Sequence, residues 1–366
     1  MGFSCGIVGL PNVGKSTLFN ALTATAAAEA ANYPFCTIEP NVGRVAVPDE
    51  RLTICARLAK SAEIVPTQLE FVDIAGLVRG AARGEGLGNQ FLSHIREVDA
   101  IAQVLRCFAD GNVTHIEGSV DPIRDAETVE TELMLADLES IERRALHLVK
   151  RARGGDKEAK EQLRVVDPVL AALREGKPAR DVLVGAEQQK TLRALQLLSS
   201  KPVLYIANID EASAASGNAE SDRVAEYAAA RGARSVMISA AIESELAQLA
   251  DAAEKGEFLA SLGVEETGLA RVIRAGYVLL RLVTFFTAGP KEAHAWTVEQ
   301  GTKAPQAAGK IHTDFERGFI RAETIAYADF TAYGGEQGAR DAGRMRLEGA
   351  DYVVQDGDVM RFRFNV

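Results

Sequence analysis

Cysteine and long apolar runs are scarce in this chain, and each shortage excludes a class of protein. Four cysteines occur in 366 residues, without the C-x-x-C spacing of zinc sites and redox centres, so neither a disulfide framework nor a zinc site is expected. No apolar stretch reaches the roughly 18 residues of a membrane-spanning helix, and the N-terminus lacks the basic and apolar segments of a signal peptide. We therefore expect a soluble, cytoplasmic protein that has no membrane partner.

Positive charge is also in the minority. The chain has 41 Lys and Arg against 51 Asp and Glu, a net charge of −10, which argues against a generally basic nucleic-acid binder and leaves room only for a local basic patch. We therefore expect no sequence-specific DNA binding. The hydrophobic content of 47% is ample for buried cores, and the length predicts two or three domains, in a protein that we expect to be monomeric.

The stretch from Gly9 to Thr17 reads G-L-P-N-V-G-K-S-T and fits the phosphate-binding pattern G-x-x-x-x-G-K-[ST]. It follows a strand-like run, residues 3–8, and opens a predicted helix, so backbone N–H groups and the helix dipole would form an anion site. The predicted ligand is a nucleoside triphosphate with magnesium, with Lys15 reaching the β and γ phosphates and Ser16 binding the metal. The residues of this loop that we expect to contact the nucleotide are Asn12, Val13, Gly14, Lys15, Ser16 and Thr17.

Strand-like and helical stretches then alternate, which predicts a mostly parallel α/β sheet with ligands at the carboxyl ends of its strands. The D-x-x-G element that begins at Asp73 follows one such strand. Asp73 is expected to hold magnesium through water, and the N–H of Gly76 to meet the γ phosphate. Thr37, in a Pro-bounded loop, is the candidate for a second hydroxyl on the metal, so the predicted magnesium site consists of Ser16, Thr37 and Asp73.

A heptad seam interrupts this alternation. Apolar residues recur at spacings of four and three from Met134 to Ala152 and again from Ala159 to Leu173, on either side of two glycines. The pattern predicts an antiparallel coiled-coil hairpin whose distal end is basic, either as a solvated face or as a docking surface for a phosphate-rich partner such as ribosomal RNA. The predicted domains are a nucleotide-binding domain at 1–120 and 199–279, the inserted hairpin at 121–198, and a small α+β domain at 280–366.

The residues after the next strand bear on the choice of base. Guanine-specific P-loop proteins place N-K-x-D here, whereas this chain has Asn208, Ile209, Asp210 and Glu211. A glutamate one methylene longer than aspartate spoils the bidentate geometry for guanine, and the amide of Asn208 could satisfy both N7 and the N6 amino group of adenine. The sequence thus favours ATP modestly over GTP. The predicted base-side residues are Asn208, Ile209, Glu211, Ser239 and Ala240.

Together these motifs resemble the YchF/Ola1 family of Obg-related ATPases. The resemblance rests on the phosphate loop, the Y-P-F-C-T-I-E-P-N loop, D-I-A-G-L with the glycine-rich arginine loop after it, and N-x-x-E in place of N-K-x-D. It covers the full length, and it implies a P-loop NTPase with an Obg-like G domain, the family's coiled-coil insertion, and a C-terminal TGS domain, a ubiquitin-like β-grasp module. It also implies an ATPase with ribosome-associated and stress-response roles.

The position that carries the water-orienting Gln in Ras-like enzymes is Leu77 here, so hydrolysis is expected to be slow. His115 matches the family's candidate catalytic histidine, and we expect it to act with Lys15 and Gly76, although a lone loop histidine is more often an ordinary surface residue. Asn12 matches a P-loop asparagine that binds a monovalent cation in potassium-activated relatives, which makes potassium stimulation a hypothesis. A GTPase translation factor of the same fold and a non-catalytic, nucleotide-dependent binding protein remain as alternatives.

Overall fold

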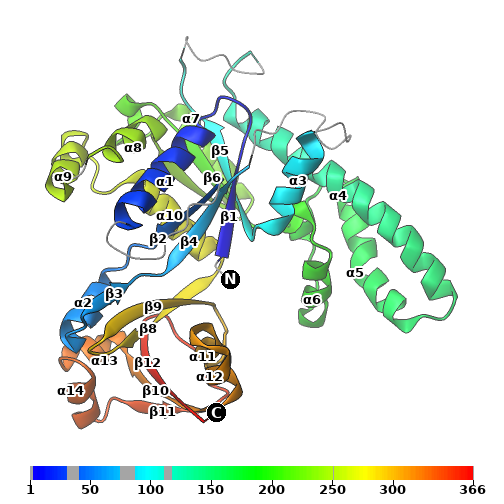
Figure 1. Ribbon diagram of the computed structural model, residues 1–366. Helices are drawn as coiled ribbons and strands as arrows, with labels where there is room; N and C mark the ends of the chain where they lie inside the picture. The colour runs from blue at the N-terminus through cyan, green and yellow to red at the C-terminus, as the bar shows by residue number, and fades with distance from the viewer. Residues whose placement is uncertain (1–2, 31–40, 75–86, 111–117, 250, 366) are drawn as a thin grey trace.

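The computed structural model describes residues 3–30, 41–74, 87–110, 118–249 and 251–365, and two six-stranded sheets organise them (Figure 1). The first sheet has the order β2-β4-β1-β5-β6-β7, and only β2 runs antiparallel to its neighbour. Its strands are β1 (Phe3–Val8), β2 (Val42–Ala46), β4 (Gln68–Asp73), β5 (Ala100–Arg106), β6 (Val203–Asn208) and β7 (Arg234–Ile238). The mostly parallel sheet expected from the sequence is confirmed.

Helices connect these strands, as parallel neighbours require. They are α1 (Lys15–Ala30), α3 (Leu87–Glu97), α7 (Ala219–Ala230), α8 (Ala240–Leu246), α9 (Ala252–Ser261) and α10 (Gly268–Leu279), with a short helix η4 (Glu211–Ser213) after β6. Every residue of β5 and of β6 is buried, as expected for strands that are covered on both faces. The carboxyl ends of β1, β4, β6 and β7 lead into the predicted nucleotide-binding motifs.

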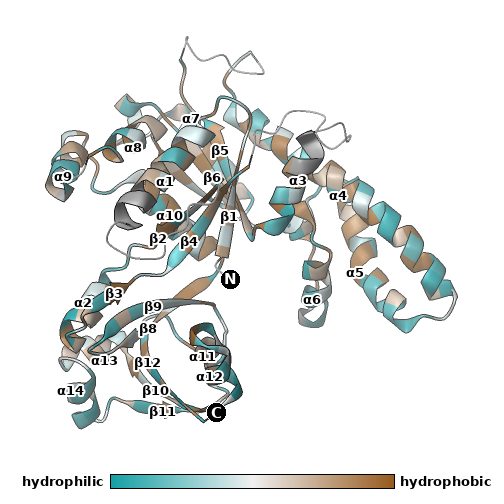
Figure 2. Cartoon of the chain, viewed as in Figure 1, coloured by the Kyte–Doolittle hydropathy of each residue, from teal (hydrophilic) through white to brown (hydrophobic). Residues whose placement is uncertain are grey.

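Two long helices, α4 (Pro122–Arg153) and α5 (Lys157–Arg174), form a hairpin that projects from this sheet (Figure 1). Asp121 caps α4 and Asp156 caps α5, each by accepting a backbone N–H three residues ahead. Figure 2 shows hydrophilic outer turns on both helices, and their facing sides bury Ile141, Leu148, Val166 and Val169. The segment that returns to the sheet contains η2 (Ala179–Asp181), α6 (Ala186–Ala194) and η3 (Leu198–Ser200).

The second sheet has the order β11-β10-β12-β8-β9-β3. Its strands are β8 (Leu282–Ala288), β9 (Glu292–Glu299), β10 (Phe319–Ala326), β11 (Arg346–Glu348), β12 (Asp358–Phe364) and β3 (Glu63–Val65). The helices beside it are α2 (Glu50–Ala59), α11 (Ala304–Ile311), α12 (Thr313–Arg317), α13 (Tyr327–Ala332) and α14 (Glu336–Asp341). Neighbouring residues of β8 point to opposite faces, so Phe285 packs with α11 while Phe286 packs with α2 and α13.

The position of α2 and β3 corrects the predicted domain division. Residues 1–120 were assigned as a whole to the nucleotide-binding domain, but β3 pairs in parallel with β9, and α2 buries Leu52 and Cys55 in the core of the second sheet. The sequence did not indicate this because β3 has three residues, whose partners lie more than 200 positions away. Within the described parts of the chain, no helix is long and apolar enough to cross a membrane.

Candidate functional site

The loop between β1 and α1 has the backbone that a phosphate-binding loop needs. Gly14 has φ +95° and Asn12 has φ +62°, values that favour glycine and asparagine over other residues. A side chain at Gly14 would also collide with the amide of Asn208, so the close approach of β6 requires glycine there. Val13 is buried, whereas Ser16 and Thr17 are exposed at the start of α1. Their hydroxyls are therefore accessible to a ligand at the helix N-terminus.

Lys15 is folded back into this loop. Its side chain is 7% exposed, and Nζ donates a hydrogen bond to the carbonyl oxygen of Leu10 at 2.7 Å. Burial lowers the pKa of Lys15 to about 8, and the nearby charge of Asp73 opposes that shift. Among the described residues, the ammonium group thus has one hydrogen-bond partner, a neutral carbonyl oxygen, and phosphate oxygens would offer it charged acceptors instead.

Asp73 ends β4 beside the loop, because the register of β1 and β4 places it opposite Ile7. Its backbone N–H donates to the carbonyl oxygen of Asn41 at 2.9 Å, but its Oδ1 is buried without a hydrogen-bond partner among the described residues. Burial raises the pKa of the Asp73 carboxyl, and the charge of Lys15 opposes that shift. A buried carboxylate oxygen that has no partner among the described residues, at the end of the strand beside the phosphate loop, has the donor chemistry that magnesium prefers.

The described residues contain no cluster of three or more His, Cys, Asp or Glu side chains that could hold a metal ion without help. Magnesium at Ser16 and Asp73 would therefore need further oxygen ligands, such as phosphates and water, which is how this ion is usually bound beside a nucleotide. P-loop NTPases generally use Mg²⁺ in this way.

Asn208 at the end of β6 joins the phosphate loop to the base-side loop. Its Nδ2 donates to the carbonyl oxygen of Val13 at 2.9 Å, and its Oδ1 accepts from the N–H of Ala240 at 3.0 Å. The side chain is 3% exposed. The sequence led us to expect both faces of this amide to meet adenine, but one donor and one acceptor already serve the protein. Asn208 thus holds two loops together, and its part in the choice of base stays a prediction.

The other base-side residues lie around Asn208. Ile209 is buried, Glu211 is exposed at the start of η4, and Asp210 caps η4 by accepting the N–H of Ser213 at 2.9 Å. Ser239 is buried, and its hydroxyl has no partner among the described residues. The structure therefore gathers the phosphate-loop residues, Asp73 and the base-side residues at one edge of the first sheet. Thr37, Gly76, Leu77 and His115 lie outside the described residues.

A buried polar group next to the base-side loop was missed from the sequence. A small cavity lined by Ser239, Glu243 and Arg271 lies between α8 and α10. Glu243 Oε1 accepts the N–H of Gly268 at 2.6 Å, whereas its Oε2 and the Nε of Arg271 have no partner among the described residues. Burial raises the pKa of Glu243. No sequence pattern indicates that Glu243 and the Nε of Arg271 are buried together, because their burial depends on the packing of α10 against α8.

A glycine loop between strand and helix, a buried lysine inside it and an aspartate at the end of the neighbouring strand together define a P-loop nucleoside triphosphatase. Two family models agree with this class. Residues 4–135 match the model described as "50S ribosome-binding GTPase", and residues 282–365 match the model named YchF-GTPase_C, described as "Protein of unknown function (DUF933)".

Full-length relatives narrow the assignment. The chain is 59% identical to the Haemophilus influenzae protein named "Ribosome-binding ATPase YchF" and 55% identical to the Bacillus subtilis protein of that name, and each match covers 100% of both chains. The solved structure titled "Structure of the Schizosaccharomyces pombe YchF GTPase" superposes with a TM-score of 0.89 at 38% identity, over 99% of this chain and 98% of that one. This chain therefore belongs to the YchF family.

Proposed function

We propose that this protein is an ATP-binding, slowly ATP-hydrolysing switch that associates with the ribosome. The arrangement of Lys15 and Asp73 carries the nucleotide part of the proposal, because it places beside one phosphate loop a cation and a buried carboxylate oxygen that no described residue partners. The full-length relatives that are named ribosome-binding ATPases support the remainder.

In the proposed site, the residues of the phosphate loop and Lys15 hold the triphosphate, and Ser16, Asp73 and Thr37 supply the oxygen ligands of magnesium. Magnesium, when bound, would neutralise charge on the phosphates. Leu77 replaces the residue that orients water in Ras-like enzymes, so turnover is slow unless another group does so, and His115 is our candidate. Asn12 is the candidate ligand for an activating potassium ion.

For the choice of nucleotide, one specific alternative to ATP has support. The S. pombe structure is titled a GTPase, and one matching family model describes a GTPase, so GTP remains the second candidate. Competition of unlabelled ATP and GTP against a fluorescent ATP analogue decides between them. We expect ATP to displace the probe at lower concentration, and tighter binding of GTP would overturn the assignment.

Hydrolysis separates an enzyme from a nucleotide-dependent binding protein. The purified protein is expected to release phosphate slowly from Mg·ATP, and Lys15→Ala to remove that activity, because the variant loses the only cation seen inside the described part of the phosphate loop. Phosphate release that is equal in the variant would point to a contaminant and would favour a binding protein without catalysis.

The ribosome-binding surface that we propose is the distal end of the α4–α5 hairpin. Arg153, Lys157 and Lys160 are exposed there. Arg151 has a different role, because it binds Asp156, the residue that caps α5, at 2.6 Å. Arg151 therefore stabilises the hairpin turn, and a test of docking should leave it unchanged.

Charge reversal of Arg153, Lys157 and Lys160 to glutamate tests this surface. Contacts to RNA phosphates depend strongly on charge and salt, so the variant is expected to co-sediment with ribosomes at least tenfold more weakly at ~100 mM salt. Reversal of Lys190 in α6, Lys255 in α9 and Lys291 in the turn between β8 and β9 gives the same change in net charge and serves as the control. Equal loss in both variants would remove the hairpin from the interface.

A further inference from the structure

The segment between β2 and β4 links the two sheets of the molecule. Strand β2 ends at Ala46 and β4 begins at Gln68, and both lie in the first sheet. Between them, α2 and β3 belong to the second sheet, where β3 pairs with residues 292–294 of β9. In Figure 1 this segment reaches from the upper sheet to the lower one. The chain therefore leaves the first unit, which is the first sheet with its helices, after Val47, and it returns near Thr67, whose carbonyl oxygen accepts the N–H of Val47. Between these residues it lies in the second unit, which is the second sheet with its helices.

The other end of this link lies at the nucleotide site. Strands β2 and β4 pair in an antiparallel register that runs from Val42 opposite Val72 to Ala46 opposite Gln68. Beyond that register, the N–H of Asp73 donates to the carbonyl oxygen of Asn41. Five paired residues span about 16 Å at roughly 3.3 Å per residue. A short, hydrogen-bonded ribbon thus runs from Asp73 to the second sheet.

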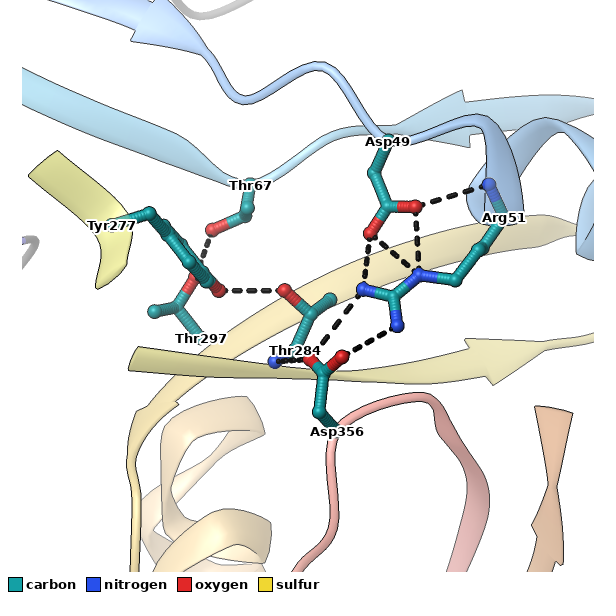
Figure 3. Close-up of polar contacts among 7 residues, drawn as sticks. All are labelled: Asp49, Arg51, Thr67, Tyr277, Thr284, Thr297 and Asp356. Atoms are coloured by element: carbon teal, nitrogen blue, oxygen red, sulfur yellow. Dashed lines mark hydrogen bonds and ion pairs between the residues drawn. The ribbon is translucent and has the colours of Figure 1, made fainter. Parts of the chain in front are cut away.

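A cluster of polar side chains, which we call the joint, ties the base of this ribbon to the second sheet (Figure 3). Arg51 binds Asp49, which caps α2, and it also binds Asp356 at 2.6 Å. Asp356 in turn accepts the backbone N–H of Thr284 at 2.9 Å. The joint consists of Asp49, Arg51, Thr67, Tyr277, Thr284, Thr297 and Asp356.

Helix α10, the last helix of the first unit, also contributes a side chain to the joint. The hydroxyl of Tyr277, in α10, lies 2.6 Å from Oγ1 of Thr284 and 3.1 Å from Oγ1 of Thr297. The hydroxyl of Thr67 meets Thr297 as well. Helix α10 begins at Gly268, whose N–H binds Glu243 beside the base-side loop. The β2–β4 ribbon and α10 therefore both extend from the nucleotide site to the joint, where Thr67 and Tyr277 contact Thr297.

We propose that the ribbon and α10 couple the nucleotide site to the second sheet through the joint, so that the ligand bound at Asp73 and Lys15 alters the packing of the second sheet against the first unit. The inference rests on the proposed function, because it needs a nucleotide at the phosphate loop. Coupling between sites is reciprocal, so weakening the joint must also change the relative affinity for ATP and ADP if these two ligands favour different packings.

Hydrogen–deuterium exchange of the full-length protein, with Mg²⁺ and either ADP or a non-hydrolysable ATP analogue, tests the coupling. In the wild type, the ATP analogue is expected to slow exchange at residues 9–17 and to change it at 47–67 and 282–299 as well, although these two regions lie in the second unit. Slower exchange at 9–17 with no change in the second unit would overturn the coupling alone. Absence of protection at 9–17 with both ATP and GTP analogues would overturn the proposed function, and this inference with it.

The double variant Tyr277→Phe with Asp356→Asn then tests the joint itself. Both changes preserve shape and remove one hydroxyl and one charge from the joint. We expect protection at 9–17 to persist, the response at 47–67 to fall by at least half, and the ratio of ATP-analogue to ADP affinity to change threefold or more. Glu336→Gln, which removes an ion pair to Arg340 elsewhere in the second unit, is the matched control and should leave both readouts unchanged. A double variant that responds as the wild type does would overturn the role of the joint.

Discussion

At the scale of single residues, Lys15 gives the nucleotide site its pH dependence. Burial lowers the pKa of Lys15 to about 8 in the ligand-free protein, and bound phosphates would favour the charged form. Above pH 8, binding must therefore take up a proton. Because about a tenth of the free protein keeps this charge one pH unit above the pKa, the dissociation constant for Mg·ATP is expected to rise up to about tenfold between pH 7 and pH 9.

Isothermal titration calorimetry at several pH values, in buffers with different ionisation enthalpies, measures both the affinity and the proton uptake. Lys15→Arg is the control, since guanidinium keeps its charge throughout this range and its profile should lose the proton uptake even if its affinity is lower. An unchanged wild-type dissociation constant up to pH 9 would mean that Lys15 stays charged in the free protein.

The sequence predicted the position of Asn208 but not its hydrogen bonds. The N-x-x-E pattern placed it at the carboxyl end of a predicted strand, and in the structure Asn208 is the last residue of the buried strand β6. Its hydrogen bonds to Val13 and Ala240 join loops that are remote in the sequence, and only the folded arrangement shows them. Residue type and local context thus predicted where Asn208 lies in the fold, whereas its hydrogen-bond partners required the structure.

At the scale of elements, the hairpin depends on how α4 is attached at its base. Asp137 is fully buried, and its carboxylate accepts the N–H of Leu198 at 2.9 Å, the N–H of Ser199 at 2.7 Å and the hydroxyl of Ser199 at 2.6 Å. Burial raises the pKa of Asp137, and these hydrogen bonds oppose that shift. This one side chain therefore fixes the returning segment, η3, against α4.

Asp137→Ala is expected to lower the free energy of unfolding by about 3 kcal/mol, because it leaves buried donors without partners. Denaturant unfolding followed by circular dichroism measures the change. Glu139→Ala, at an exposed position of the same helix, should stay within about 0.5 kcal/mol of the wild type. A loss for Asp137→Ala no larger than that of Glu139→Ala would show that η3 does not need this attachment.

The hairpin was predictable from the sequence, but α6 and β3 were not. The seam from Met134 to Leu173 repeats over many turns and is broken by two glycines, so both helices and their pairing followed from periodicity alone. Helix α6 has only nine residues, and β3 has three. Segments this short carry too few periodic positions, and tertiary contacts determine their structure.

At the scale of the whole molecule, the second sheet is not built from the C-terminal part of the chain alone. Helix α2 covers one of its faces, where Leu52, Cys55 and Ala56 are each at most 4% exposed and pack with Phe286 and Phe330. Strand β3 covers the edge of β9. Removing these elements exposes an apolar face and a free strand edge, and both favour aggregation.

A fragment consisting of residues 280–366 is therefore expected to lack a cooperative thermal transition and to bind a hydrophobic dye, although a family model matches it as a unit. Full burial of a leucine contributes about 1.5 to 3 kcal/mol, and α2 adds the smaller Cys55 and Ala56 to Leu52, so their loss is a substantial fraction of the ~5 to 15 kcal/mol that stabilises a typical domain. A fusion in which residues 47–67 precede residues 280–366 through a flexible linker restores the covered face and should melt cooperatively.

The same fusion with Leu52→Asp is the control, because a charged side chain in that core opposes packing without changing the length of the chain. Cooperative melting of the fragment without residues 47–67 would show that α2 and β3 only rest on a sheet that is stable without them.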